Sequence, residues 1–138
     1  MIGKQFVEAL KEAKDKGVDV RVIVDGIGEW YSVPIIGPYL RKHDIPFTRF
    51  LPPRIYPFSP LINLRNHRKI LVIDGKVAFT GGINIRDKHV LSQYKKKNKI
   101  QDVHFKLTGP IVTQLEEIFI HDWFFCTGEK NKKKETTP

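Results

Sequence analysis

The stretch from His67 to Asn84 reads HRKILVIDGKVAFTGGIN, and its polar and glycine residues follow the spacing H-x-K-x4-D-x6-G-G-x-N. His67 and Lys69 are two residues apart in an apolar, β-branched run, so on a strand both side chains point to the same face. A nucleophile beside a cation suits attack on a phosphodiester, whose negative charge must be neutralised. The stretch therefore predicts a strand that carries catalytic groups.

The second half of this stretch predicts a tight hairpin. Asp74-Gly75 is a dipeptide suited to a two-residue turn, and residues 77–80 can return as the partner strand. Gly81-Gly82 allows the backbone to approach a ligand closely, and Asn84 supplies an uncharged donor just beyond it. We favour a turn-forming role for Asp74 over a chemical one, because Asp commonly occupies turns.

The 138-residue chain has the apolar content (41%) and charged content (28%) of an ordinary globular domain, but its formal net charge is +9. This sign favours anionic partners such as phospholipid headgroups, phosphorylated substrates or nucleic acid. The alternative, which assigns no binding role to this charge, is that the lysines at 95–97 and 130–134 are merely solvated. The single cysteine, Cys126, excludes an internal disulfide, and we expect it to pack in a helix. We expect neither a transmembrane helix nor a signal peptide.

The order of hydrophobic patterns along the chain predicts an α/β fold, in which a mixed sheet is flanked by helices on both faces. Residues 51–61 hold four prolines among large apolar side chains, which predicts a loop that covers the core or forms an apolar lip beside the motif. The expected helices span residues 3–16, 34–42 and 110–125, and the expected strands span 18–25, 46–50, 64–73, 77–80 and 102–107.

The motif resembles the signature of the phospholipase D superfamily. The likeness extends through Gly17-Val18-Asp19-Val20-Arg21, Asp25-Gly26, Gly109-Pro110 and Asp122-Trp123, a set that resembles the N-terminal catalytic half of bacterial cardiolipin synthases. The resemblance implies a phospholipase D-like half-domain over residues 1–128. The remaining residues, 129–138, are expected to form a disordered basic tail.

Several features depart from the family pattern. Many members have Gly-Ser where this chain has Gly81-Gly82, and their W-x-D motif corresponds here to Ile100-Gln101-Asp102. Such enzymes carry two catalytic motifs, whereas this chain holds one. It also begins at a helix that in the family follows a first strand, and the family's N-terminal membrane segments are absent. The expectation is a fragment of a two-half enzyme.

The resemblance assigns roles to the motif residues. His67 would be one of two catalytic histidines, the nucleophile that forms a covalent phosphohistidine, without metal or cofactor. Lys69, Asn84 and Gly82 would bind the phosphate oxygens, and Asp102 is the candidate for orienting His67. Asp74 belongs to the catalytic signature as well, and Arg68 alternates to the opposite strand face. The remaining histidines lack metal-ligand spacing: His43, His89, His104 and His121.

The resemblance implies a phosphatidyltransferase that moves a phosphatidyl group between phosphatidylglycerol molecules. Its partners would be anionic phospholipid, a membrane surface and a second catalytic half or homodimer partner, rather than nucleic acid. The chain would lie peripherally at the bacterial cell membrane, or alternatively in the cytoplasm. Two other functions stay open: a homodimeric phosphodiesterase or nuclease, in which each subunit supplies one histidine, and an inactive fragment.

Overall fold

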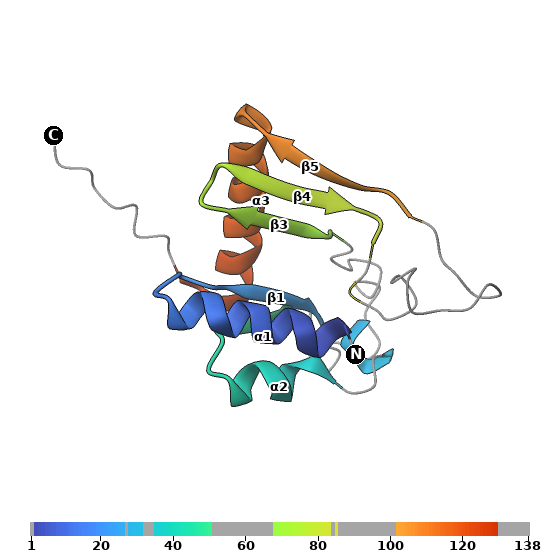
Figure 1. Ribbon diagram of the computed structural model, residues 1–138, viewed down its shortest axis with the longest axis vertical. Helices are drawn as coiled ribbons and strands as arrows, with labels where there is room; N and C mark the ends of the chain where they lie inside the picture. Colours follow the sequence, from blue (N-terminus) through green and yellow to red (C-terminus); the bar gives the residue numbers. More distant parts are fainter. Residues whose placement is uncertain are drawn as a thin grey trace, which may run out of the picture.

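The computed structural model describes residues 2–26, 28–31, 35–50, 68–83, 85 and 102–129. Their arrangement is shown in Figure 1. The predicted loop at 51–61, the lysine-rich segment at 87–99 and the tail beyond Glu129 lie outside the described residues. None of the helices in these ranges is long and apolar enough to cross a membrane. The elements are α1 (Ile2–Asp15), β1 (Val22–Asp25), the 3₁₀ turn η1 (Gly28–Tyr31), α2 (Ile36–Lys42), β2 (Phe47–Phe50), β3 (Ile70–Ile73), β4 (Val77–Gly81), β5 (His104–Thr108) and α3 (Pro110–Thr127).

The first part of the chain is a parallel strand pair packed against two helices. β1 and β2 are paired in parallel along their whole length. Alternation along β1 directs Val22 and Val24 toward α1 and α2, where both pack against the buried residues. The buried core between these helices and strands consists of Val7, Val20, Leu40 and Ile45.

A buried carboxylate joins α2 to the end of β2. Glu29 in η1 is only 4% exposed. Its Oε1 accepts a hydrogen bond from the backbone N–H of Gly37 at 2.6 Å, and its Oε2 accepts one from Arg49 Nε at 2.5 Å. Because the N-cap residue of α2 makes no side-chain cap, Glu29 supplies the acceptor and the negative charge that a first helical turn favours. A Cβ at position 37 would overlap the Arg49 guanidinium, so this packing requires glycine.

The second part of the chain is an antiparallel sheet in the order β3-β4-β5, which rests on α3. Ala78 in the central strand and Val112 in α3 are completely buried. The opposite sheet face, turned toward the viewer in Figure 1, holds Leu71 and Ile73, which are 37% and 44% exposed. Among the described residues this sheet is therefore well covered on one face only.

The helices lie on both sides of the strands. α1 and α2 pack against one face of the parallel pair, whereas α3 crosses behind both sheets and contacts each of them (Figure 1). The predicted α/β class is confirmed. The strands form two small sheets, β1-β2 and β3-β4-β5, rather than the single mixed sheet that we expected.

The first strand is shorter than the sequence predicted. We expected it to begin at Val18, but β1 begins at Val22. Gly17 is left-handed, with φ of 87°, and the N–H of Val18 donates to the carbonyl of Ala13 at 3.1 Å. Val18 therefore completes the C-terminal turn of α1 and is not free to enter the sheet.

The predicted strand at 102–107 is present as β5, but its apolar side chains are not buried. Val103 and Phe105 are 60% and 57% exposed. Within the described part of the chain, β5 is an edge strand that pairs with β4 alone. The alternation along residues 102–107 therefore predicted the strand correctly.

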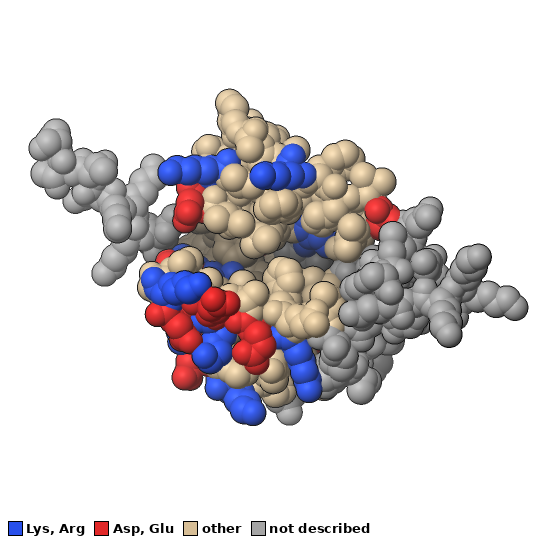
Figure 2. Space-filling view, viewed as in Figure 1, with Lys and Arg blue, Asp and Glu red and all other residues tan. Residues whose placement is uncertain are grey.

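Charged pairs cover the C-terminal part of α1, where acidic and basic side chains gather in Figure 2. Lys11 pairs with Asp15, and Lys16 with Glu12, each at 2.7 Å. The hydrogen bonds from these lysines lower the pKa of both carboxyl groups. Pairs exposed in this way contribute little to folding and mainly keep the surface soluble.

Candidate functional site

The motif forms the predicted β3–β4 hairpin with an Asp-Gly turn. Asp74 and Gly75 have φ of 53° and 61°, the two positive values of a type I′ turn. The N–H of Lys76 donates to the carbonyl of Ile73 at 3.0 Å and closes the turn. Asp74 is exposed and lies at the opposite end of β3 from Lys69. This position supports a turn-forming role for Asp74 rather than a chemical one.

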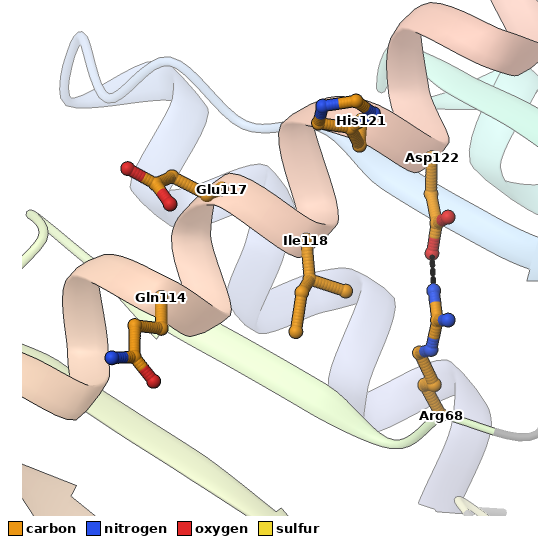
Figure 3. Close-up of a pocket in the computed structure, with 6 residues that line it drawn as sticks. All are labelled: Arg68, Gln114, Glu117, Ile118, His121 and Asp122. Atoms are coloured by element: carbon orange, nitrogen blue, oxygen red, sulfur yellow. Dashed lines mark hydrogen bonds and ion pairs between the residues drawn. The ribbon is translucent and has the colours of Figure 1, made fainter.

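Lys69 and Arg68 stand immediately before β3. Arg68 Nη1 lies 2.7 Å from Asp122 Oδ2 in α3, an ion pair that ties the start of the motif to the helix (Figure 3). Lys69 is half-buried, and strand alternation gives it the parity of Leu71 and Ile73, on the face turned away from α3. The side chains of Arg68 and Lys69 therefore point to opposite faces of the sheet, with Arg68 directed toward α3.

Asp102 lies against the double glycine at the end of β4. A Cβ at position 82 would overlap the Asp102 carboxylate, and one at position 81 would overlap the carbonyl oxygen of Val103. The N–H of Gly82 donates to that carbonyl at 3.0 Å, and Asp102 Oδ1 accepts from the N–H of Val103 at 2.8 Å. The space beside both glycines is therefore filled by the chain's own Asp102–Val103 segment. The expected contact of Gly82 with phosphate stays a prediction.

The sheet register brings three predicted site residues to one edge. Ile70 is paired with Thr80, and Gly81 with His104. The residues just outside these pairs, Lys69, Gly82 and Asp102, therefore all lie where β3 begins, β4 ends and β5 begins. In Figure 1 the end of β1 lies at the same side of the molecule. An ammonium, a carboxylate and the double glycine thus share one edge of the antiparallel sheet.

Two predicted site residues, His67 and Asn84, lie outside the described residues. Each is a direct chain neighbour of this edge, because Arg68 and Ile83 are described on either side of the hairpin. Their assignments as nucleophile and phosphate ligand stay predictions.

A cleft of about 480 Å³ opens beside α3 and is bordered by Arg68. Figure 3 shows Ile118 and Asp122 pointing toward Arg68, while Gln114 and Glu117 point away from it along the helix. Of the motif residues described, only Arg68 lines this cleft, so it is distinct from the edge that holds Lys69 and Asp102. Its lining residues are Arg68, Gln114, Glu117, Ile118, His121 and Asp122.

Cys126 packs on α3 as predicted for a structural thiol. It is half-buried. Burial raises the pKa of the Cys126 thiol, the nearby Asp122 carboxylate raises it further, and a hydrogen bond with Thr48 opposes both. A raised pKa leaves little thiolate near neutral pH, so this group is a poor nucleophile.

No local sequence pattern indicated the Glu29–Arg49 pair. Glu29 follows a glycine-containing turn and resembles an exposed loop residue, and its partners are 8 and 20 residues away. The one usable signal is Gly37, a glycine within the first turn of a predicted helix, where a close approach by another group is a common reason.

Comparison with known proteins finds a matching family and several similar curated proteins. The family described as "Cardiolipin synthase, PLD-like domain" matches residues 1–123. The cardiolipin synthase of Geobacillus kaustophilus is 40% identical over 133 residues, covering 94% of this chain and 26% of the relative. That of Clostridium perfringens is 39% identical over 125 residues, covering 91% of this chain and 26% of the relative.

A third similar protein is cardiolipin synthase 2 of Bacillus cereus, 36% identical over 132 residues, with 93% of this chain and 25% of the relative covered. The chain thus spans about a quarter of the length of the curated relatives it matches. No solved structure matches the chain.

Proposed function

The chain belongs to the cardiolipin synthase family with a phospholipase D-like domain, and we propose that it supplies the first catalytic half of a phosphatidyltransferase. The proposed reaction transfers a phosphatidyl group from one phosphatidylglycerol to the hydroxyl of another and releases glycerol. The observation that carries this proposal is the shared edge where Lys69, Gly82 and Asp102 meet, directly beside His67 and Asn84 in the chain.

In the proposed first step the imidazole of His67 attacks the phosphorus of phosphatidylglycerol. A P–N bond forms as the bond from phosphorus to the glycerol oxygen breaks, and a protonated histidine of the second half donates its proton to that oxygen. In the second step this histidine takes the proton from the hydroxyl of another phosphatidylglycerol. The freed oxygen attacks phosphorus and breaks the P–N bond, which regenerates His67.

The other residues of the edge stabilise charge in this scheme. Lys69 and Asn84 bind the non-bridging oxygens of the phosphoryl group, where negative charge is held through both steps. Asp102 accepts the second ring N–H of His67 and orients the imidazole, as the third member of a triad does. Gly82 leaves room for the carboxylate of Asp102.

Anionic phospholipid fits the charge of the chain. The formal net charge of +9 attracts negatively charged headgroups. The second catalytic histidine comes from another half-domain or another copy of this chain, because one imidazole serves poorly as both nucleophile and acid. We propose a peripheral position on the bacterial membrane for this part of the enzyme.

The proposal is tested with vesicles of fluorescent phosphatidylglycerol and thin-layer analysis of cardiolipin and free glycerol. His67→Ala should abolish product, and Lys69→Ala should lower the rate by about 10²-fold or more, as loss of a charge-stabilising group does. Lys76→Ala is the matched control, because Lys76 lies at the hairpin turn at the far end of β3, and it should leave the rate unchanged. The same preparations are offered single-stranded DNA.

Three results would contradict the assignment. Hydrolysis of DNA without turnover of lipid would establish the phosphodiesterase or nuclease alternative. Equal activity of the Lys69→Ala and Lys76→Ala variants would show that the motif edge takes no part in the reaction. Absence of both activities, also after addition of the remaining part of a relative's enzyme, would identify an inactive fragment.

A further inference from the structure

The motif residues Arg68 and Lys69 lie beyond the last hydrogen-bonded pair of their hairpin. The register of β3 with β4 begins at Ile70, which is paired with Thr80. Arg68 and Lys69 precede this pair and belong to no strand. Ladder hydrogen bonds fix the backbone only where they are made. The positions of these two residues therefore depend on contacts outside the ladder.

The ion pair between Arg68 and Asp122 supplies such a contact. Arg68 Nη1 lies 2.7 Å from Asp122 Oδ2, and in Figure 3 the two side chains point toward each other from the start of β3 and from α3. The Asp122 side chain is 16% exposed, whereas that of Arg68 is 55% exposed. A carboxylate that has lost most of its contact with water is costly without a positive partner, so Asp122 favours keeping Arg68 beside it.

The helical turn that carries Asp122 is itself well anchored. Its neighbour Trp123 is 6% exposed and stacks on Phe119, with ring centroids 6.2 Å apart. Trp123 Nε1 also donates to Glu129 Oε2 at 3.0 Å, and the Arg21 guanidinium lies 5.8 Å from the centre of the Trp123 ring. α3 contacts strands of both sheets. Asp122 therefore extends from a fixed element to the start of the motif.

Alternation along the chain determines what this attachment can do. Arg68 points toward α3, whereas Lys69 has the parity of Leu71 on the opposite face. Arg68 stands in the chain between Lys69 and His67, the two residues to which the proposed reaction assigns phosphate binding and attack. Asp122 therefore holds the backbone from the face that is turned away from the Lys69 side chain.

We propose that Asp122 is a positioning residue of the phosphoryl-transfer site, which acts through Arg68 to fix the backbone that carries Lys69 and its neighbour His67. This inference rests on the proposed function, because it links the position of those two residues to the rate of transfer. A displacement of about 1 Å at a reacting site can lower a rate by about 10²-fold. Asp122 itself neither binds phosphate nor transfers a proton in this scheme.

The first measurement uses the full chain without lipid. In Asp122→Ala the backbone order parameter of the Lys69 amide, obtained from ¹⁵N relaxation, should fall from about 0.85, the value of rigid backbone, to about 0.6. The order parameter of Val72 within β3 should stay unchanged. Glu117→Ala is the matched control, because Glu117 is an acidic residue of the same helix and cleft that points away from Arg68 in Figure 3.

The second measurement is turnover of the fluorescent phosphatidylglycerol vesicles described above. Per folded molecule, Asp122→Ala should lower kcat by about 10²-fold with little change in KM, because lipid still binds while the reacting groups are misaligned. A purely structural residue would lower the melting temperature and leave the kcat of the folded fraction unchanged. Asp122→Glu keeps the carboxylate and should recover most of the rate, whereas Glu117→Ala should retain the kcat of the wild type.

A double-mutant cycle tests whether Asp122 acts through Arg68. Arg68→Ala and Asp122→Ala should each lower kcat. The double variant should be no slower than the slower single variant, because all three break the same attachment. Circular dichroism at each temperature of assay gives the folded fraction by which kcat is divided.

Three outcomes would overturn the proposal. One is an unchanged order parameter at Lys69 in Asp122→Ala, and another is a kcat of Asp122→Ala equal to that of Glu117→Ala. The third is additive losses in the cycle, which would mean that Asp122 and Arg68 act separately. Failure of the wild type to turn over lipid would instead overturn the proposed function. The relaxation measurement is made without lipid, so it still decides whether Asp122 holds the start of the motif.

Discussion

The parallel and antiparallel parts of the molecule differ in how completely they are packed. The β1–β2 pair shares a buried core with α1 and α2, and an internal ion pair joins its loop, helix and strand. The β3–β5 sheet is buried against α3 but exposes Leu71 and Ile73 on its other face. The residues assigned to chemistry belong to the less enclosed part. A packed scaffold thus lies beside a sheet whose edge carries the residues proposed for chemistry.

The largest expected difference in stability is between substitutions of two leucines, one in each part of the molecule. Leu40 in α2 is 1% exposed, whereas Leu71 in β3 is 37% exposed. Leu40→Ala should lower the free energy of unfolding by about 4 kcal/mol, because it removes buried methyl groups and leaves a cavity. Leu71→Ala should cost less than about 1 kcal/mol, since surface substitutions rarely cost more. Urea denaturation measures both, and equal losses would contradict the comparison.

The next largest effect on stability is expected at the internal Glu29–Arg49 ion pair. Glu29→Ala should lower the free energy of unfolding by about 3 kcal/mol, because Arg49 would keep its charge in a partly buried position without a partner. The Arg49 side chain is 32% exposed, which places the expected cost at the lower end for such pairs. Glu12→Ala is the matched control on the exposed face of α1. A comparable loss in that control would mean that burial of Glu29 is unimportant.

A smaller effect is expected at the motif edge. Gly82→Ala should cost about 1–3 kcal/mol, because the new Cβ would overlap the Asp102 carboxylate and force it to move. In Gly3→Ala the Cβ would be 3.6 Å from Ile36, an ordinary contact, and loss of a helical glycine should stabilise α1 slightly. A double-mutant cycle of Gly82→Ala with Asp102→Ala measures the coupling. Additive costs would show that the two residues do not interact.

The smallest effect is the acid response of the α1 surface. The folded-state pKa values of Asp15 and Glu12 lie below their ordinary values of 3.8 and 4.5. The pairs therefore stabilise the fold above those ordinary values, and this contribution is lost as the pH falls through the lowered pKa values. Between pH 7 and pH 3, the melting temperature of an Asp15→Asn, Glu12→Gln double variant should fall slightly less than that of the wild type. A steeper decline of the melting temperature in the variant would show that these ion pairs do not stabilise the fold at neutral pH.

Local sequence patterns predicted most of the elements, because each pattern reports on neighbouring residues. The Asp74-Gly75 turn, the β3–β4 hairpin and the helix after Pro110 all depend on contacts within a few positions. The sequence also placed Arg68 and Lys69 on opposite faces, and the contact of Arg68 with Asp122 agrees with this for Arg68.

Features that depend on distant contacts were not predicted. Glu29 is buried because Gly37 and Arg49 converge on it, and no local pattern encodes that meeting. The separation into two sheets depends on which strand edges meet, which periodicity does not report. The approach of Asp102 to Gly82 depends on the register of β4 with β5, although the glycine pair itself was a visible signal of close contact.

The position of α3 along the chain has a consequence for synthesis. α3 is the last element described, and it is the helix that contacts both sheets. A ribosome releases residues in order, so the hairpin and the parallel pair can each form while the helix is still in the exit tunnel. Until it emerges, Ala78 lacks the cover that this helix provides, and the nascent chain exposes apolar surface at that side of the sheet.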